Sequence, residues 1–563
     1  MGTKETTLSL VNPESIGGGE DPAVPGVAAS VGALLGAFGQ GQVVVREAVQ
    51  FGKECLKIAV GRSAVTAPRG DRRFTDPAWT TNPIYHRVQQ AYLTSTEAVD
   101  GVVEQWGSTV DDQRAQRAAF AANIVTSALA PTNFLPTNPA AIKEAFDTAG
   151  ISLVRGLGNY LSDLRRNGGM PSMVDPDAFT VGVDLAVTPG AVITRDGVGE
   201  LLHYTPTTET VYERPVLVVP PPIGRFYFLD LRPGRSFVEY SVSQGLSTFL
   251  LSWRNPQPEQ GHWDLDTYAR TVSSAIDEIC AVTGCEDVNV IGFCAGGIIM
   301  TTLLNHMTAH GDKRVHSNVL RCDNARFRER GATSGVLGIA HPPVREEPLP
   351  AQGCHQRPRM GSAFTWMRPN DLVFNYVVNN YLMGRTPPAF DVLAWNADGT
   401  NLPAALHGQF LDIFADNLLA RTGSMSVLGT PIDLAEIEIP TFVSGAIADH
   451  LTAWKSCYRT TQLLGGDSTF VLSYSGHIAS LVNPPGNPGA YYWEGGTPGA
   501  DPDEWLNHAT KKQGTWWESW ARWVTERAGE RLPTSRAFTP NGREPLGKAP
   551  GLYVLDAVED IPQ

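Results

Sequence analysis

The octapeptide VIGFCAGG at residues 290–297 strongly limits how this chain can fold. Strand-forming residues at 288–291 lead into a cysteine flanked by glycines, and an apolar helix-forming stretch, 298–304, follows. This order is typical of a nucleophile elbow, the tight strand-to-helix turn written G-x-S-x-G, with Cys294 in place of serine. The alternative is a buried structural cysteine beside glycines that allow close helix packing. Residues elsewhere in the chain are needed to distinguish a nucleophile elbow from a structural cysteine.

Composition excludes several classes of protein. Acidic residues outnumber basic ones among the 563 residues, giving a net charge of −14, which with the lack of a basic block argues against nucleic acid as a partner. Seven cysteines without a C-x-x-C pair argue against structural zinc and favour a reducing cytoplasm. The N-terminus lacks the apolar core of a secretory signal. The longest early apolar stretch, 27–38, is too short to span a membrane.

The sequence pattern divides the chain into three parts. We expect a poorly ordered segment at 1–45, where PESIGGGEDP is typical of a linker, then a helical domain at 46–200 and a catalytic domain at 201–563. The pattern changes near residue 178, so the boundary is expected between 178 and 212. Helices are predicted at 83–96, 114–129, 139–148 and 151–164.

Beyond this boundary, short apolar runs alternate with helices. Such alternation indicates an α/β domain built on a mainly parallel sheet. Residues 321–360 are rich in Arg and Pro and lack a clear period, which suggests a surface insertion, and we place a lid at about 318–390. The predicted strands are 216–219, 247–252, 289–291, 441–444 and 469–473, with helices at 265–282 and 454–464.

Two further residues follow predicted strands in the order expected of a catalytic triad. Nucleophile, acid and histidine follow one another along the chain in folds with this elbow. Asp449 comes after the strand in IPTFVSGAIADHLTAW, and His477 after the strand in STFVLSYSGHIASL. Taken alone, Asp449 could cap a helix, and the neighbouring His450 could be the titrating group. Together with Cys294, the ordered set favours the triad.

The oxyanion hole is predicted from two backbone N–H groups. One is that of Ala295, directly after the candidate nucleophile, and the other lies in the loop VVPPPIGRFYF after an early strand. Ile223 or Gly224 is the expected donor there, with Ile223 preferred. The prolines at 220–222 have no N–H and can only make the loop rigid.

A thiol nucleophile suits acyl transfer better than hydrolysis. A thiolate attacks thioesters readily and holds the acyl group as another thioester, which remains activated. A serine ester would have lost most of that energy. Transfer of an acyl chain to an alcohol through Cys294 is therefore expected, with no metal or redox cofactor.

The sequence resembles the polyhydroxyalkanoate synthases, the polyester polymerases of bacterial storage granules. The resemblance extends over about residues 45–555. The matching motifs are DRRFTDPAW (71–79), PTNFLPTNP (131–139), RNGGMPSMVD (166–175), FLDLRPGRS (228–236), SWRNP (252–256), GFCAGG (292–297), MRPNDLVFNYVVNNYL (367–382), ADHLTAW (448–454) and SGHIASLVNPP (475–485).

This resemblance implies a fold, an activity and a location. The fold is an α/β-hydrolase domain with a lid insertion, preceded by a helical domain, and the triad positions fall on Cys294, Asp449 and His477. The activity is polymerisation of (R)-3-hydroxyacyl-CoA with release of CoA. The enzyme is expected in the cytoplasm, at the surface of polyester granules, as a homodimer. PPAFDVLAWNADGTNLPAALHGQF (387–410) is similar to the single-subunit, medium-chain branch.

Residues 321–360 depart from the family pattern. Family members usually have an apolar strand and a regular helical segment there, whereas this chain has arginines and prolines until the familiar sequence resumes at Phe364. A divergent insertion and a compensated reading-frame shift both explain such a block. Two other functions also stay open: a cysteine-type thioesterase or depolymerase on the same fold, and an inactive granule-associated homologue.

Overall fold

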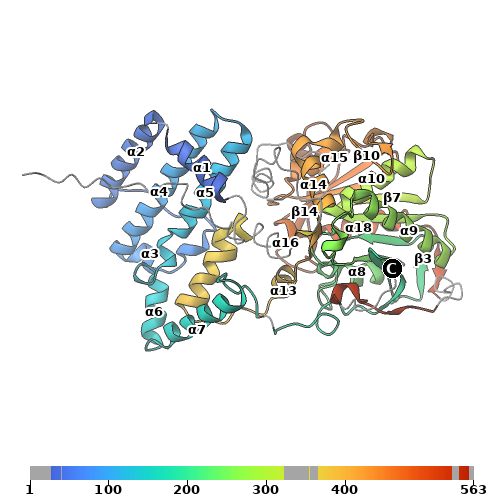
Figure 1. Cartoon of the computed structure of the whole chain (residues 1–563), viewed down its shortest axis with the longest axis horizontal. Coiled ribbons are helices and arrows are strands. Elements are labelled where there is room, and N and C mark those ends of the chain that lie inside the picture. Colours follow the sequence, from blue (N-terminus) through green and yellow to red (C-terminus); the bar gives the residue numbers. More distant parts are fainter. Residues whose placement is uncertain are drawn as a thin grey trace, which may run out of the picture.

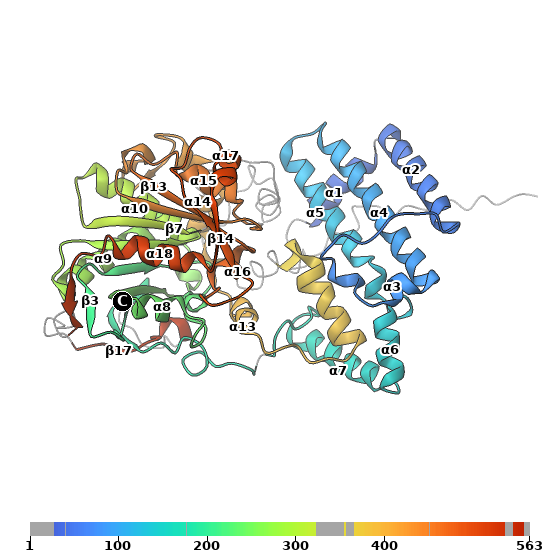
Figure 2. The same cartoon turned by 180° about the vertical axis from the view of Figure 1, so that it is seen from behind.

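The structure is a computed structural model, in which a helical region lies beside a large sheet covered by helices (Figures 1 and 2). It describes residues 27–39, 41–175, 177–321, 354–355, 365–449, 451–534 and 544–556. Within these residues, no helix combines the length and the apolarity that crossing a bilayer requires.

The helical region occupies the N-terminal part of the chain, and the four helices predicted there are confirmed, the first of them extending further than expected. Its longest helix starts with Pro83 in the first turn, and the Asn82 side chain accepts from the N–H groups of Ile84 and Tyr85. A proline and an Asn cap in these places favour a helix start. The helices are Val27–Phe38 (α1), Gly41–Ala59 (α2), Ala78–Thr81 (α3), Pro83–Gly107 (α4), Asp112–Ala128 (α5), Pro139–Asp147 (α6) and Ile151–Arg166 (α7).

The prediction of a poorly ordered segment through residue 45 is wrong for most of its second half. Helix α1 packs against α5, and α2 packs against α4. Ala37 is fully buried in a small apolar cluster with Val102, Trp106 and Ala118. Contacts with residues far along the chain thus stabilise helices in a sequence whose glycines suggest a linker. Residues 1–26 lie outside the described residues.

The central sheet has the strand order β15-β14-β13-β12-β7-β6-β4-β5-β2-β1-β17 among the described residues. Neighbours from β13 to β5 are parallel, and the flanking strands on both sides are antiparallel. The strands are Gly190–Arg195 (β1), Gly199–Tyr204 (β2), Val216–Val219 (β4), Thr248–Trp253 (β5), Val288–Phe293 (β6), Val315–Arg321 (β7), Thr441–Ala446 (β12), Ser468–Ser473 (β13), Tyr491–Glu494 (β14), Thr510–Gln513 (β15) and Gly547–Lys548 (β17).

All five predicted strands are present, and the sheet is larger than predicted. Residues 190–200, which we assigned to the helical domain, begin its antiparallel edge. Strand β7 was not predicted, although it lies between β6 and β12. Small pairs complete the strands: Thr210–Tyr212 (β3) with Arg531–Pro533 (β16), Cys354–His355 (β8) with Leu402–Pro403 (β9), and Ser426–Val427 (β10) with Thr430–Pro431 (β11).

Helices cover both faces of the sheet. Along β4, Leu217 and Val219 belong to one apolar cluster, and Val216 and Val218 belong to another. Because successive side chains of a strand point to opposite faces, this alternation means that both faces are buried. One cluster includes side chains of α9, α10 and α14, the other those of α8 and α18. The helices are Phe237–Ser243 (α8), Leu265–Thr283 (α9), Ala295–Ala309 (α10), Asp391–Ala397 (α13), Ala404–Asp416 (α14), Trp454–Thr460 (α15), His477–Leu481 (α16), Pro502–His508 (α17) and Trp516–Thr525 (α18).

Part of the predicted lid packs on the helical region. Two π-helical turns, Asn370–Phe374 and Val377–Leu382, lie against α5 and α7, although some two hundred residues separate them in the sequence (Figures 1 and 2). A Cβ atom on Gly156 would lie 1.8 Å from the Tyr381 carbonyl oxygen, so only glycine allows this approach. The Tyr381 hydroxyl donates to Asp163 over 2.9 Å.

This packing limits what the predicted lid can be. In the described part of 318–390, the residues before 322 form β7, and residues 370–382 pack on α5 and α7. Residues 322–353 and 356–364 lie outside the described residues. The interpretation of the Arg- and Pro-rich block as part of a lid therefore stays a prediction.

Candidate active site

Cys294 lies at the turn between β6 and α10. Its backbone has φ 51° and ψ −125°, an unfavourable conformation for a residue with a Cβ atom. Its carbonyl accepts from the N–H of Gly297 over 2.8 Å, which closes the turn, and its side chain is half-buried. Strain at this point is what a nucleophile elbow requires. The predicted strand–turn–helix geometry is thus present.

Glycines on both sides of Cys294 permit this turn. A Cβ atom on Gly292 would lie 2.6 Å from the Gly297 Cα atom. One on Gly296 would lie 2.3 Å from the Val219 carbonyl oxygen, at the end of β4. Side chains at these positions would collide with backbone. The glycines therefore bring the elbow against the loop that was predicted to supply the oxyanion hole.

Asp449 and His477 are in direct contact. Asp449 follows β12, and His477 is the first residue of α16, after β13. The His477 Nδ1 atom lies 2.6 Å from Asp449 Oδ2, and their side chains are 4% and 0% exposed. This is the acid–histidine contact of a triad. His450, the alternative titrating group, lies outside the described residues.

The Asp449 carboxylate accepts four hydrogen bonds. Besides His477, the donors are the Leu451 N–H at 2.8 Å, the Thr452 N–H at 2.9 Å and the Thr452 hydroxyl at 2.7 Å. Burial raises the pKa of Asp449. The attraction of His477 and the hydrogen bonds from His477 and Thr452 lower this pKa by more than burial raises it, so it lies well below its ordinary value. An ionised Asp449 holds the proton on Nδ1 and leaves Nε2 of His477 able to act as a base.

Strand order places Cys294 at the same edge of the sheet as this pair. The parallel strands β6, β7, β12 and β13 are consecutive neighbours, and all three predicted triad residues follow the carboxyl ends of these strands. The Cys294 N–H donates to the Arg321 carbonyl at the end of β7, over 2.9 Å. The structure thus brings Asp449 and His477 into contact and places Cys294 at the same edge of the sheet, after β6.

One of the two suggested loop donors for the oxyanion hole already has an acceptor. The Gly224 N–H donates to the Thr400 hydroxyl over 2.8 Å, so it is already occupied. Among the described residues, no acceptor pairs with the N–H of Ile223 or of Ala295. Ala295 and Ile223 stay the predicted donors, and Ile223 is preferred over Gly224 in the loop.

The loop at 220–225 is held in place by aromatic side chains. The Trp253 indole donates to the Pro220 carbonyl over 2.8 Å, and the Trp395 indole donates to the Arg225 carbonyl over 2.7 Å. Trp395 belongs to α13, which directly follows the predicted insertion, so this helix contacts the loop near the candidate site. This arrangement gives the loop the rigidity that a preorganised oxyanion hole needs.

Two residues that support the site were not predicted from the sequence. Thr452 donates to Asp449, and its hydroxyl lies 3.4 Å from His477 Nδ1. Its place three residues after an Asp is a recognisable turn-capping pattern. Arg321 is fully buried at the end of β7, where an apolar residue would be expected, and no sequence signal indicated that strand.

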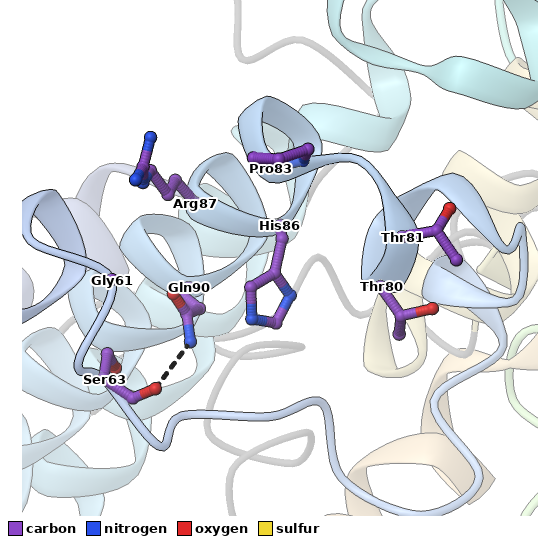
Figure 3. A pocket seen from close by; sticks show the side chains of 8 residues that line it. All are labelled: Gly61, Ser63, Thr80, Thr81, Pro83, His86, Arg87 and Gln90. Atoms are coloured by element: carbon purple, nitrogen blue, oxygen red, sulfur yellow. Dashed lines mark hydrogen bonds between the residues drawn. The ribbon is translucent and has the colours of Figure 1, made fainter.

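A pocket of about 230 Å³ in the helical region is separate from this edge (Figure 3). Two of its polar side chains bond to the chain itself: His86 Nδ1 contacts the Trp79 carbonyl at 3.0 Å, and Gln90 donates to the Ser63 carbonyl at 3.2 Å. These contacts give its polar residues a structural role. The lining residues are Gly61, Ser63, Thr80, Thr81, Pro83, His86, Arg87 and Gln90.

The fold and the site define an α/β-hydrolase-type protein with a cysteine at the nucleophile position. Residues 234–484 match the profile of the alpha/beta hydrolase fold, which confirms the predicted fold class. Residues 70–241 match a profile described as the N-terminus of poly-beta-hydroxybutyrate polymerase (PhaC).

Whole-chain relatives identify the family. The chain is 42% identical to poly(3-hydroxyalkanoate) polymerase 1 and 43% identical to polymerase 2 of Ectopseudomonas oleovorans, each over 90% of both chains. It is 35% identical to the polymerase subunit PhaC of Cupriavidus necator, over 94% of this chain and 91% of that one. The chain therefore belongs to the poly(3-hydroxyalkanoate) polymerase family. The predicted family and the predicted enzyme class, an acyltransferase, are confirmed.

Proposed function

We propose that this enzyme polymerises (R)-3-hydroxyacyl-CoA into polyester through a thioester on Cys294. The observation that carries the proposal is the strained elbow at Cys294 on the same sheet edge as the Asp449–His477 pair. Its family supplies the reaction type. Greater identity to the two Ectopseudomonas oleovorans polymerases than to the Cupriavidus necator subunit supports placing the chain near the former.

The site residues divide the reaction into two transfers. First, the Cys294 thiolate attacks the acyl-CoA carbonyl, the Sγ–C bond forms, and the CoA thiol leaves with a proton from the His477 imidazolium. Next, the hydroxyl of a 3-hydroxyacyl group attacks a thioester carbonyl while His477 Nε2 accepts its proton. An ester forms and a thiol is released. Ala295 and Ile223 would stabilise the oxyanion in both steps.

The hydrogen bonds of Asp449 favour an orienting role over direct action on the incoming hydroxyl. All four of its hydrogen-bond donors come from protein groups, including His477 itself. A carboxylate engaged in this way fixes the tautomer and the direction of the imidazole. We therefore assign proton removal from the hydroxyl to His477.

No metal or redox cofactor is part of this proposal. The thioester substrate is already activated, and a thiolate with a histidine partner can attack it without a Lewis acid. Activity should therefore persist when a chelator is added. Restoration of chelator-lost activity by a divalent metal would contradict this part of the proposal.

The decisive experiment separates polymerisation from the alternative fates of the acyl group. The purified protein is incubated with (R)-3-hydroxyacyl-CoA, and insoluble polymer, free hydroxy acid and released CoA are measured together. Polymer in near-equal amount to released CoA is the expected result. Free acid would identify a thioesterase or depolymerase, and absence of CoA release would identify an inactive homologue.

We also propose that an apolar face of α7 contacts the polyester granule. Ile151, Val154, Leu157, Leu161 and Leu164 follow helical spacing along one side, and Val154 is 73% exposed. The opposite side of α7, with Gly156 and Asp163, is the one that residues 370–382 cover. A contiguous exposed apolar face of this kind marks an interaction surface.

Particle binding tests this location. Val154→Glu combined with Leu157→Glu should reduce co-sedimentation with poly(3-hydroxyalkanoate) particles. Val183→Glu is the matched control, because Val183 is similarly exposed but lies outside the helix. Equal binding by both variants would contradict the role of α7. In cells, an enzyme that forms polymer but stays diffuse in the cytoplasm would contradict granule association altogether.

For assembly, we propose a monomer–dimer equilibrium in which the dimer is more active, as resemblance to the family implies. The buried Val373 and Tyr376 show that much of the segment at 370–382 is covered by this chain itself. Phe390, 44% exposed, lies further along the predicted lid and is accessible to a partner. Sedimentation beside specific activity tests the coupling. Constant specific activity across the transition would exclude it.

A further inference from the structure

Two cysteines meet at the C-terminal end of α9. Their Sγ atoms, in Cys280 and Cys285, lie 3.8 Å apart, which is van der Waals contact. Both side chains are half-buried, so small reagents can reach them. Neither belongs to the candidate active site: Cys285 precedes β6, and Cys294 follows it. A six-residue strand separates the two ends by about 20 Å.

The local fold brings these two thiols together. Helix α9 ends at Thr283, and Gly284 adopts a left-handed conformation with φ 73°. The Gly284 N–H donates to the Cys280 carbonyl over 2.8 Å, which turns the chain back over the last helical turn. In this type of helix end, the residue after the glycine normally makes an apolar contact with the residue four positions before that glycine. Here both contact positions are cysteines.

We propose that Cys280 and Cys285 form a redox-active dithiol, a modification site that a low-molecular-weight disulfide such as oxidised glutathione converts into an intramolecular disulfide. A contact that usually only packs a helix end here joins two thiols that can form a disulfide. The pair satisfies the condition that both sulfurs be close and accessible before any rearrangement of the chain.

The surroundings assign Cys285 as the attacking thiol. The hydrogen bond shared with the Cys280 thiol and the one from the Thr283 hydroxyl, which lies 3.0 Å from Cys285 Sγ, outweigh burial and hold the pKa of Cys285 at about 7. The hydrogen bond with Cys285, together with burial, raises the pKa of Cys280. A thiolate at neutral pH is therefore favoured on Cys285, which supports it as the first to react.

The reaction balances as two thiol–disulfide exchanges. The Cys285 thiolate attacks one sulfur of oxidised glutathione, forming a mixed disulfide and releasing one glutathione thiolate, which takes up a proton. Cys280 then gives up its proton and attacks the Cys285 sulfur, releasing the second glutathione. The protein thiols lose two electrons, and these reduce one glutathione disulfide to two thiols.

Peptide mapping of the full-length enzyme can detect this disulfide directly. Cleavage after Glu278 and Glu286 gives a peptide, 279–286, that holds both thiols but not Cys294. After graded exposure to oxidised glutathione and alkylation, the wild-type peptide should lack both alkyl groups and keep an internal disulfide. Cys55, half-buried on α2, and buried Cys457 should stay alkylatable at the same dose.

Two single variants test the assigned order. In Cys280→Ser, the mixed disulfide on Cys285 should accumulate because no second thiol resolves it. In Cys285→Ser, Cys280 should stay unmodified. Both should retain CoA release from acyl-CoA, which confirms that they fold. If Cys55 reacts as fast as Cys285, or if peptide 279–286 stays fully alkylated while Cys294 is oxidised, the proposal is wrong.

Discussion

The backbone N–H of Cys294 donates to the carbonyl oxygen of Arg321 over 2.9 Å, so the candidate nucleophile is bonded to the last residue of β7. The same arginine also contacts α16, the helix that begins with His477. Its guanidinium donates to the Ser480 hydroxyl at 2.8 Å, and that hydroxyl donates to the His477 carbonyl at 2.8 Å. Arg321 therefore connects the elbow to the helix that begins with the candidate base.

Replacement of Arg321 tests this connection. Arg321→Met keeps an unbranched apolar stem but removes the guanidinium and its hydrogen bond to Ser480, so His477 should be held less firmly. We expect kcat to fall about 10-fold or more with KM nearly unchanged, because small displacements of a catalytic group are costly. The urea midpoint, measured beside kcat, separates loss of stability from loss of positioning, because the variant also loses the contact of the guanidinium with the Trp516 ring. An unchanged kcat would show that the arginine only fills space.

Cys294→Ser tests the nucleophile. The elbow should still fold, because serine has nearly the same size, while turnover should fall by orders of magnitude because a hydroxyl is a much weaker nucleophile toward a thioester. The measurements are CoA release and the mass of the Cys294 peptide, obtained by cleavage after Glu residues, which shows whether the thiol carries an acyl group. Cys457→Ser, at a fully buried cysteine outside the elbow, is the control. Acylation found on Cys457 instead of Cys294 would overturn the assignment.

Asp449→Asn tests the orienting role of the carboxylate. The variant should lose on the order of 10⁴-fold in rate, since an amide does not hold His477 in the required tautomer. Acylation in a single turnover and subsequent elongation should be slowed equally. A much larger loss in elongation would instead indicate that Asp449 acts on the incoming hydroxyl. His477→Gln is the companion variant, in which acylation itself should disappear.

Much of this site was predictable because an elbow has a local signature. Cys294, Asp449 and His477 were each identified from a strand followed by a characteristic residue, and the structure places them at one sheet edge. Thr400 could not be foreseen as the partner of Gly224, because it lies 176 residues away in the sequence and only the folded chain brings it to the loop.

The errors in the predicted fold have a common physical origin. Val27–Phe38 is rich in glycine and alanine, and its helix depends on packing against α5, which a local pattern does not reveal. Strand β7 ends in a buried arginine, which obscures the apolar run on which strand prediction rests. Residues 370–382, part of the predicted lid, fit α7 through Gly156, a contact between distant parts of the chain that a local pattern does not reveal.

A buried histidine should make stability depend on pH. His203 is stacked on Phe249 with ring centroids 3.9 Å apart, and burial lowers its pKa to about 3. In the unfolded chain its pKa is about 6.5, so below that pH the unfolded state binds the extra proton. The stabilising contribution is therefore complete above about pH 6.5 and decreases as the pH falls toward about 3.

The matching experiment compares wild type with His203→Gln, which can still bond to the Ser247 hydroxyl. The wild type should lose about 2 kcal/mol more than the variant between pH 7 and pH 5 in urea unfolding. Because other groups titrate equally in both proteins, the difference isolates His203. Parallel pH profiles for the two proteins would contradict a neutral buried histidine.

Two glycines on α7 offer a matched test of how the segment at 370–382 packs. A Cβ atom on Gly156 would lie 1.8 Å from the Tyr381 carbonyl, whereas one on Gly158 meets nothing within 4 Å. Gly156→Ala should therefore push the segment away from α7 and expose it to proteolysis. Gly158→Ala should instead stabilise the helix by about 0.5–1 kcal/mol, since alanine is the better helix former. Limited proteolysis and thermal unfolding of both variants, measured beside wild type, check the pair. Equal protection of the segment in both would mean that its contact with α7 does not hold it in place.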